Sequence, residues 1–276
     1  MRFYRMSGAR ILGALIVLLS AILVSKAPLP ARPFSGLAGY HHDPAIIHQR
    51  HGSNATSTNW SGYAVTGANG SVTDVKGSWI VPTVTCAGAP DSYSSSWVGI
   101  DGYASNTVEQ IGIDADCVGG KPNYFAWFEF YPHWPYTINT VAVQPGDTIL
   151  AEVNYGAKGQ FTVTLTNVYQ NQTFSTSTKM PQAKLSSAEW ITEAPSSSGV
   201  LPLANFGTAF FGQNNTGQTG TGYATVSGKA GAIGSFNPTD VIRIDMVTSS
   251  GALKAQTSTL STDGTSFTDA WISPGP

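Results

Sequence analysis

Charged side chains are scarce in this sequence. Lys, Arg, Asp and Glu make up 11% of its 276 residues, whereas an average soluble domain devotes about a quarter of its residues to them. The formal net charge at pH 7 is -2, from 14 basic and 16 acidic residues. Because a nucleic-acid-binding domain carries a basic patch or stripe, this composition argues against nucleic acid as a partner.

Histidine and cysteine are also few, and their positions exclude several kinds of catalytic centre. Four of the five histidines precede residue 55, so a serine or cysteine nucleophile of the body would have to use His133. The sequence has no G-x-S-x-G motif, no histidine-rich zinc motif and no phosphate-binding glycine loop. We therefore expect no metal and no cofactor, and any catalysis must use carboxylates, amides and hydroxyls.

The N-terminal segment has the pattern of an export signal. Arg2, Arg5 and Arg10 precede an uncharged, mostly aliphatic run at 11–24. This run is shorter than the roughly 20 residues that a transmembrane helix needs. We interpret residues 1–27 as a cleaved signal peptide and predict a secreted, extracellular protein that is free of the membrane after processing. An uncleaved membrane anchor is the alternative.

Residues 28–55 form a second segment, with four prolines and most of the histidines. Residues 1–54 hold 6 of the 14 basic residues and one of the 16 acidic residues, which leaves residues 55–276 with 8 basic and 15 acidic residues, a net charge of -7. A basic, histidine-rich leader beside an acidic body fits a propeptide held by charge attraction, which protonation of its histidines and of the body's carboxylates would loosen. A plain linker or a metal-binding tract is the alternative.

The body, residues 56–276, has the pattern of a single β-rich domain. No stretch of twelve or more residues repeats with a helical period, whereas strand-like alternation recurs at 126–131, 161–166, 188–194 and 241–247. Turn sequences such as those at 145–147 and 263–264 separate such runs. Many short strands with these turns predict an all-β fold, a two-sheet antiparallel sandwich of the jelly-roll or concanavalin-like type.

Only two cysteines are present, Cys86 and Cys117. Two cysteines exclude a framework of several disulfides. In an exported protein a single disulfide between them is favoured over two free thiols.

The acidic residues of the body lie within its most aromatic segments. The period of two along a strand places three groups of side chains on one face each: Gln110 with Gly112 and Asp114, Glu189 with Ile191 and Glu193, and Trp127 with Glu129 and Tyr131. An amide two positions from a glycine leaves room above the strand for a ligand. An acidic residue on a half-buried strand usually faces water, but the clustering of these residues suggests a site.

Taken together, these segments resemble the eqolisins, which are fungal-type, pepstatin-insensitive acid glutamic peptidases. The resemblance covers most of residues 59–211. The motifs themselves match, and so do their order and spacing. Its carriers are 59–63, 97–102, 110–114, 126–132, 146–147 and 188–193. The family implies a β-sandwich with the active site on a concave sheet face, a signal peptide and a propeptide.

The resemblance also assigns site residues. The family's catalytic pair is a glutamine and a glutamate, which fall on Gln110 and Glu193, with Glu189 as the rival because it is four residues earlier on the same face. The positions that line or support the family's cleft are Trp60, Trp97, Asp101, Asp114 and Glu129. One departure stands out: Phe125 occupies a position where fungal members carry an acid, so the pH profile is expected to differ.

The implied mechanism is hydrolysis of polypeptide substrates at acidic pH. An ionised Glu193 would act as general base on a water and then pass the proton to the leaving amine. The side-chain amide of Gln110 would donate to the developing oxyanion, an interaction worth about 3 kcal/mol in comparable sites. Hydrogen bonds from neighbours are expected to keep Glu193 ionised at low pH. We expect the chain's own propeptide to act as inhibitor, and nothing in the sequence demands more than a monomer.

Two other classes of protein fit parts of the pattern. A jelly-roll glycoside hydrolase would also use two carboxylates, such as Glu129 and Glu193, with tryptophans as sugar platforms. A non-catalytic carbohydrate-binding sandwich would tolerate Glu193→Gln. A glycosidase has no need of Gln110, so that residue separates it from a peptidase.

Overall fold

The computed structural model describes residues 1, 32–33, 39–88, 90–156 and 158–275. Strands make up nearly all of its regular structure. They are β1 (Arg32–Pro33), β2 (Ile47–His51), β3 (Asn54–Ser57), β4 (Trp60–Thr66), β5 (Val72–Ile80), β6 (Ser95–Ile100), β7 (Val108–Val118), β8 (Lys121–Tyr131), β9 (Tyr136–Ile138), β10 (Thr148–Gly156), β11 (Gln160–Asn167), β12 (Gln172–Thr178), β13 (Ser187–Glu193), β14 (Thr208–Phe211), β15 (Tyr223–Val226), β16 (Lys229–Ala232), β17 (Val241–Val247), β18 (Leu253–Thr257) and β19 (Phe267–Trp271). One turn of helix, α1 (Gln213–Thr216), and one 3-10 turn, η1 (Ile233–Ser235), complete them.

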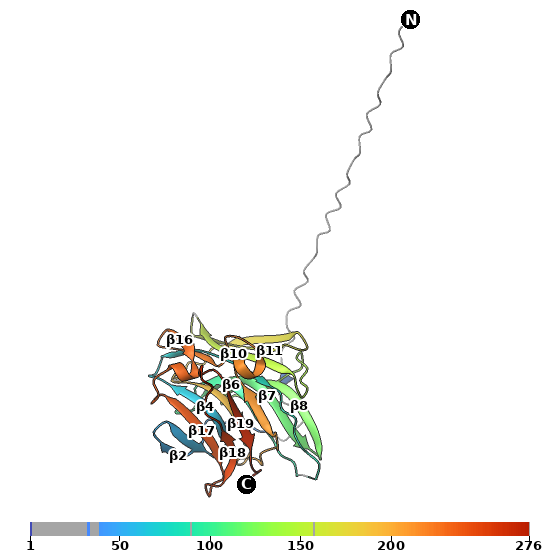
Figure 1. The fold of residues 1–276 in the computed structure, drawn as a ribbon, viewed down its shortest axis with the longest axis vertical. Coiled ribbons are helices and arrows are strands. Elements are labelled where there is room, and N and C mark those ends of the chain that lie inside the picture. The colour runs from blue at the N-terminus through green and yellow to red at the C-terminus, as the bar shows by residue number, and fades with distance from the viewer. Residues whose placement is uncertain (2–31, 34–38, 89, 157, 276) are drawn as a thin grey trace.

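The strands form two layers. One sheet runs β9-β8-β7-β6-β13-β4-β17, with every neighbour antiparallel. The other runs β12-β11-β10-β5, and β14 and β15 also pair with β5. Strands β19 and β18 continue from β14 to β17 and so join the layers on one side. Figure 1 shows β10 and β11 lying across the layer that holds β6, β7 and β8. The predicted all-β antiparallel sandwich is confirmed.

Alternation along the strands sends apolar side chains between the layers. In β11, Phe161, Val163 and Leu165 are fully buried, and the threonines between them are partly exposed. In β7, Ile111 and Ile113 point into the same core. The residues at the alternate positions, Gln110, Gly112 and Asp114, therefore face the outer side of that sheet. We call this side the site face.

The site face is covered by the chain's own leader, residues 39–46, so both sides of the central strands are buried. The backbone amide of His41 donates to the carbonyl of Ser196, and that of Ala45 donates to the carbonyl of Gly102. Residues 47–57 then form the β2–β3 hairpin, in which β3 pairs in parallel with β17 at the sheet edge. The expected boundary between propeptide and body, at 55–56, falls inside β3.

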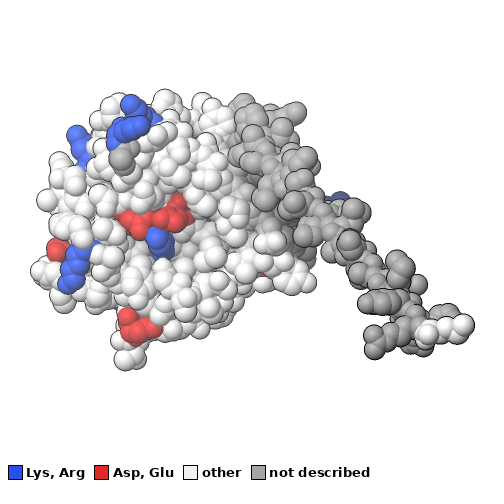
Figure 2. All heavy atoms as spheres, turned by 90° about the horizontal axis from the view of Figure 1, so that it is seen from above, with Lys and Arg blue, Asp and Glu red and all other residues white. Residues whose placement is uncertain are grey.

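Burial of acidic side chains is the feature that the sequence least suggested. Nine of the 16 acidic residues are buried, and eight of those nine are fully inaccessible to solvent. The nine are Asp101, Glu109, Asp114, Asp116, Glu129, Asp147, Glu189, Glu193 and Asp269. The expectation that acids on half-buried strands face water is wrong here. In agreement, Figure 2 shows a face on which charged atoms are few among uncharged ones.

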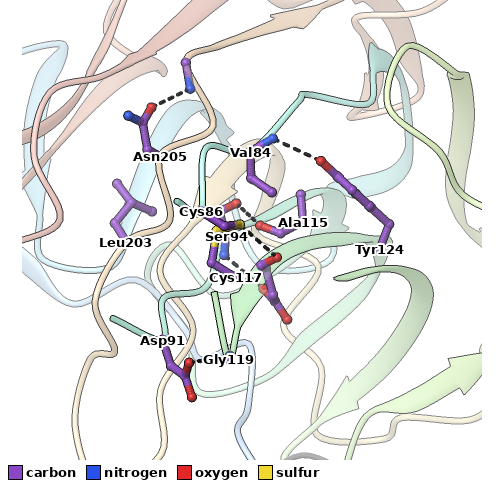
Figure 3. The surroundings of a disulfide bond; sticks show 12 residues. Val84, Cys86, Asp91, Ser94, Ala115, Cys117, Gly119, Tyr124, Leu203 and Asn205 are labelled. Atoms are coloured by element: carbon purple, nitrogen blue, oxygen red, sulfur yellow. Dashed lines mark hydrogen bonds between the residues drawn. A yellow bond between two sulfur atoms is a disulfide. The ribbon is translucent and has the colours of Figure 1, made fainter. Parts of the chain in front are cut away.

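Cys86 and Cys117 are joined in a disulfide that ties the loop before β6 to the end of β7, with Cα atoms 5.3 Å apart. Figure 3 shows Val84, whose backbone amide donates to the hydroxyl of Tyr124 on β8 at 3.0 Å. The bridge therefore fastens the 81–94 loop to the β7–β8 pair.

The part of the chain that the structure describes contains no helix that is long and apolar enough to cross a membrane. The expected signal peptide, 1–27, lies outside the described residues apart from Met1.

Candidate active site

Gln110 lies in the middle of β7 with its side chain on the site face and fully buried. Its amide nitrogen Nε2 donates to the backbone carbonyl of His42 at 2.7 Å. Its Oε1 atom has no hydrogen-bond partner among the described residues. The family resemblance assigned Gln110 Nε2 to the stabilisation of an oxyanion, and here this atom donates to a peptide carbonyl of the leader.

The space above Gly112, expected to be open for a ligand, is filled by Trp97. An added Cβ at Gly112 would lie 2.5 Å from the Trp97 Cβ, and one at Gly99 would lie 2.8 Å from the Trp97 ring. Gly99 therefore leaves the room that the Trp97 ring occupies, and a side chain at Gly112 would clash with Ser96 and Trp97 of the neighbouring strand. Its Nε1 donates to Glu193 Oε2 at 2.8 Å.

Glu193, the last residue of β13, is fully buried, and its Oε1 has no hydrogen-bond partner among the described residues. Burial raises the pKa of Glu193 well above its usual value, against the opposing effects of His42 and of the Trp97 hydrogen bond. The expectation that neighbours keep Glu193 ionised at low pH is wrong for the leader-bound protein. Burial removes water from the carboxyl, and neither the indole donor nor the nearby His42 compensates for that loss.

The leader lies on the site face in an extended path, held at backbone atoms on both sides of His42. The His42 amide donates to Glu129 Oε2 at 3.0 Å. On the other side, Trp60 Nε1 donates to the carbonyl of Asp43 at 2.9 Å, and Asn59 Nδ2 donates to that of Pro44 at 3.0 Å. This set of contacts to main-chain atoms is what a site for extended peptides provides.

The side chains of the leader meet the acidic residues of β7 and β8. His41 Nδ1 lies 2.6 Å from Glu129 Oε1, and His42 Nε2 lies 3.1 Å from Asp114 Oδ1. The hydroxyl of Tyr40 donates to Asp114 at 2.6 Å and to Asp116 at 2.9 Å. Burial, and then the neighbouring Asp114 charge, raise the pKa of Asp116 well above its usual value.

Asp116 was missed by the sequence analysis. The signal was present, because Asp116 follows Gln110 and Asp114 with the same period of two along β7.

Asp101 supports the site without touching the leader. Its carboxylate accepts hydrogen bonds from the backbone amides of Lys184, Leu185 and Ser186 at 2.6 to 2.9 Å, and from the Ser186 hydroxyl at 2.8 Å. Asp101 adopts a left-handed backbone conformation with φ of 71°, which Asp tolerates better than most residues. The residue anchors the loop that leads into β13.

The structure separates the two candidate glutamates. Glu189 is fully buried, and neither of its carboxylate oxygens has a hydrogen-bond partner among the described residues. Burial, then Asp101 and Glu109, raise its pKa well above the usual value, against the opposing effect of Ser187. Glu193 is coupled instead to His42, Asp43 and Glu129. Only Glu193 therefore lies in the part of the site face that the leader crosses.

Phe125, at the position where the family's fungal members carry an acid, is partly buried and packs against the apolar cluster that includes Trp60, Trp97 and Trp127.

Of the residues predicted from the sequence, the structure brings six to the leader or its immediate support: Trp60, Trp97, Gln110, Asp114, Glu129 and Glu193.

Comparison with known proteins identifies a matching family and two similar proteins. Residues 58–271 match the model of the peptidase A4 family. Aspergillopepsin-2 of Aspergillus niger is 29% identical over 179 residues, 56% of this chain and 62% of that protein. Scytalidopepsin B of Scytalidium lignicola is 29% identical over 121 residues, 44% of each chain. The matched region thus spans less than two thirds of either curated relative.

Solved structures share the fold. Scytalido-glutamic peptidase with a transition-state analogue inhibitor matches with a TM-score of 0.63 at 21% identity, covering 78% of this chain and 98% of that one. Aspergilloglutamic peptidase from Aspergillus niger matches with a TM-score of 0.55 at 25% identity, covering 66% and 99%.

Proposed function

Because the chain belongs to the peptidase A4 family, we propose that it is a secreted endopeptidase that hydrolyses internal peptide bonds at acidic pH, with Gln110 and Glu193 as its catalytic pair. The resemblance to the eqolisins is confirmed by the family match and the related structures. The observation that carries the proposed site is the peptide carbonyl of His42 on the Gln110 amide.

The contacts of Gln110 and Glu193 support a hydrolytic role for the pair. Gln110 Nε2 points at a peptide carbonyl oxygen, where charge develops when a nucleophile adds to the carbon. Gln110 Oε1 and Glu193 Oε1 are buried acceptors with unused capacity. In the mechanism we propose, a water donates its hydrogens to these oxygens, Glu193 takes one proton as the water attacks, and the leaving amine receives it.

The leader supports a role as inhibitory propeptide. The leader occupies the part of the site face that would otherwise be open to a substrate. Gln110 and Glu193 are both fully buried in its presence. Burial raises the pKa of Glu193, which reduces the ionised fraction of the base and slows cleavage while the leader is bound. Removal of the leader would expose Glu193 to water and lower its pKa. We propose that the processed enzyme is a monomer.

The test compares the processed wild type with Glu193→Gln, Gln110→Ala and Glu189→Gln on an acid-unfolded protein substrate across pH 2–7, with pepstatin present. We expect cleavage by the wild type and a loss of roughly 100-fold or more in kcat in the first two variants. Glu152→Gln, an exposed carboxylate on β10, is the matched control and should match the wild type.

Each other outcome has a definite meaning. If Glu193→Gln retained activity and Glu189→Gln did not, the base would be Glu189. If the folded, processed wild type cleaved no protein or peptide at any pH, the proposed function would be wrong.

A further inference from the structure

The side chain of His42 occupies a built pocket on the site face. Its imidazole stacks on the indole of Trp127, with ring centroids 3.4 Å apart and planes within 4°. Its Nε2 lies 3.1 Å from Asp114 Oδ1, and its Nδ1 lies 3.4 Å from Glu129 Oε2. His42, Asp114, Trp127 and Glu129 are all fully buried. The pocket therefore offers one aromatic plane, a carboxylate hydrogen-bonded to Nε2 and a second carboxylate at ion-pair distance from Nδ1.

This arrangement matches a protonated imidazole better than any other natural side chain. The imidazolium ion is flat, carries a positive charge and has a donor at each nitrogen, and a cation over an indole face is attracted by the ring quadrupole. Although burial lowers the pKa of His42, Asp114 and Glu129 outweigh that effect and raise it to about 10. A histidine in this pocket is thus charged throughout the acid range.

The backbone contacts around His42 indicate which residue of a substrate this pocket would bind. Its carbonyl oxygen is the one that Gln110 holds, and the next two carbonyls, of Asp43 and Pro44, are held by Trp60 and Asn59. If the carbonyl on Gln110 marks the bond to be cleaved, His42 is the residue immediately before that bond and Asp43 the residue immediately after it.

We infer that Trp127, Asp114 and Glu129 form a histidine-selective subsite for the residue preceding the cleaved bond, so that the enzyme prefers polypeptides with histidine at that position. The inference rests on the proposed function. The chain's own His42–Asp43 bond is its first substrate: the hydroxyl of a water bonds to the His42 carbonyl carbon, the bond to the Asp43 nitrogen breaks, and that nitrogen gains the proton.

Other side chains leave part of the pocket unsatisfied. Leucine or phenylalanine would remove the donor from Asp114 Oδ1 and the cation from between the carboxylates of Asp114 and Glu129, which is costly in a buried site. Lysine brings charge but no plane to stack on Trp127. Arginine brings both in a longer group, so we expect it to rank second.

The first arm of the test uses synthetic peptides of the leader sequence, Gly-Tyr-His-His-Asp-Pro-Ala-Ile, with the second histidine replaced by leucine, phenylalanine, lysine or arginine. Processed wild-type enzyme is assayed at about pH 4, at which free histidine is protonated, and the cleaved bond is located by mass spectrometry. We expect cleavage after the second histidine, with kcat/KM at least ~10-fold above the leucine and phenylalanine peptides.

The second arm asks whether the pocket causes the preference. Asp114→Asn should lower the ratio of kcat/KM for the histidine and leucine peptides several-fold, whereas Glu152→Gln should leave that ratio unchanged. Equal rates on histidine and leucine peptides, or a ratio that Asp114→Asn does not change, would overturn the inference and leave the proposed function in place.

The third arm needs no peptidase activity. In the full-length Glu193→Gln chain, His42→Leu should speed amide hydrogen exchange across residues 40–46. His51→Leu, the same substitution at an exposed leader position, should not. Faster exchange with no cleavage by the wild type would keep the subsite and reject the peptidase. Unchanged exchange in His42→Leu would reject the subsite.

Discussion

Carboxylates in this protein take their properties from what surrounds each one. Asp101 and Glu189 sit four positions from residues of the proposed site, yet Asp101 accepts four hydrogen bonds and Glu189 accepts none in the described structure. The alternation of strands was enough to predict which side chains share the site face. It did not predict which carboxylates would be satisfied, because the donors come from loops with no periodicity.

Asp101→Ala should be strongly destabilising, because it leaves three backbone amides of the 184–186 loop without an acceptor. At about 1–3 kcal/mol for each buried unsatisfied group, we expect at least ~3 kcal/mol off the free energy of unfolding, measured by urea denaturation. Asp91→Ala removes an exposed acceptor of a single amide, that of Gly119, and should cost about 1 kcal/mol or less. Equal losses in the two variants would contradict the anchoring role.

Position 42 shows the limit of sequence reasoning at this scale. A basic, histidine-rich leader beside an acidic body suggested electrostatic attraction, and the histidines do lie against Asp114 and Glu129. His42 and Gln110 are 68 positions apart, and no pattern in either segment relates the two. Their meeting depends on the path of the leader over the folded sheet.

Among the elements, the long strands were easier to predict than the short ones. The expected runs at 126–131, 161–166 and 241–247 lie in strands, and the run at 188–194 lies in β13 except for its last residue, since each alternates over enough residues to define two faces. The β2–β3 hairpin was not predicted. All five residues of β2 are exposed, so its sequence carries no hydrophobic alternation. The hairpin is placed instead by the pairing of β3 with β17.

The disulfide should contribute measurably to stability through the loop that it closes. Cys86 and Cys117 are 31 positions apart, and loop entropy for that length gives about 3.5 kcal/mol. We expect the double substitution of both cysteines to serine to lower the urea midpoint, and to raise the denaturant slope because the unfolded chain without the bridge is less compact. Oxidised wild type is the reference, and reduced wild type should resemble the variant. No difference between oxidised and reduced wild type would contradict the prediction.

For the molecule as a whole, buried acids should make folding most favourable in acid. Burial raises the pKa of Asp269 to about 7, in spite of opposing hydrogen bonds from Ser61, Thr192 and Thr257, and burial raises that of Glu109 to about 9. Above about pH 4 the unfolded chain releases these protons while the folded chain keeps them. Each group therefore removes up to about 1.4 kcal/mol of stability per pH unit until its folded pKa is reached.

We expect the Tm of the Glu193→Gln chain, which lacks the proposed catalytic base, to fall steadily from pH 4 to pH 8. Asp269→Asn in that background keeps an acceptor for Ser61 and abolishes the titration, so it should flatten the curve between about pH 4 and pH 7. Differential scanning calorimetry measures both. A Tm that rose with pH in the parent chain would show that the buried carboxyls are paired and ionised.

The continuity of the leader with the β2–β3 hairpin has a final consequence, for reversibility. While the chain is intact, residues 40–42 meet the site at an effective concentration set by a short tether, which for such links is in the millimolar range. The proposed cut after His42 would turn that intramolecular contact into an ordinary bimolecular equilibrium. On dilution the freed peptide would not rebind, so a single hydrolysis would make activation one-way without any change in the contacts themselves.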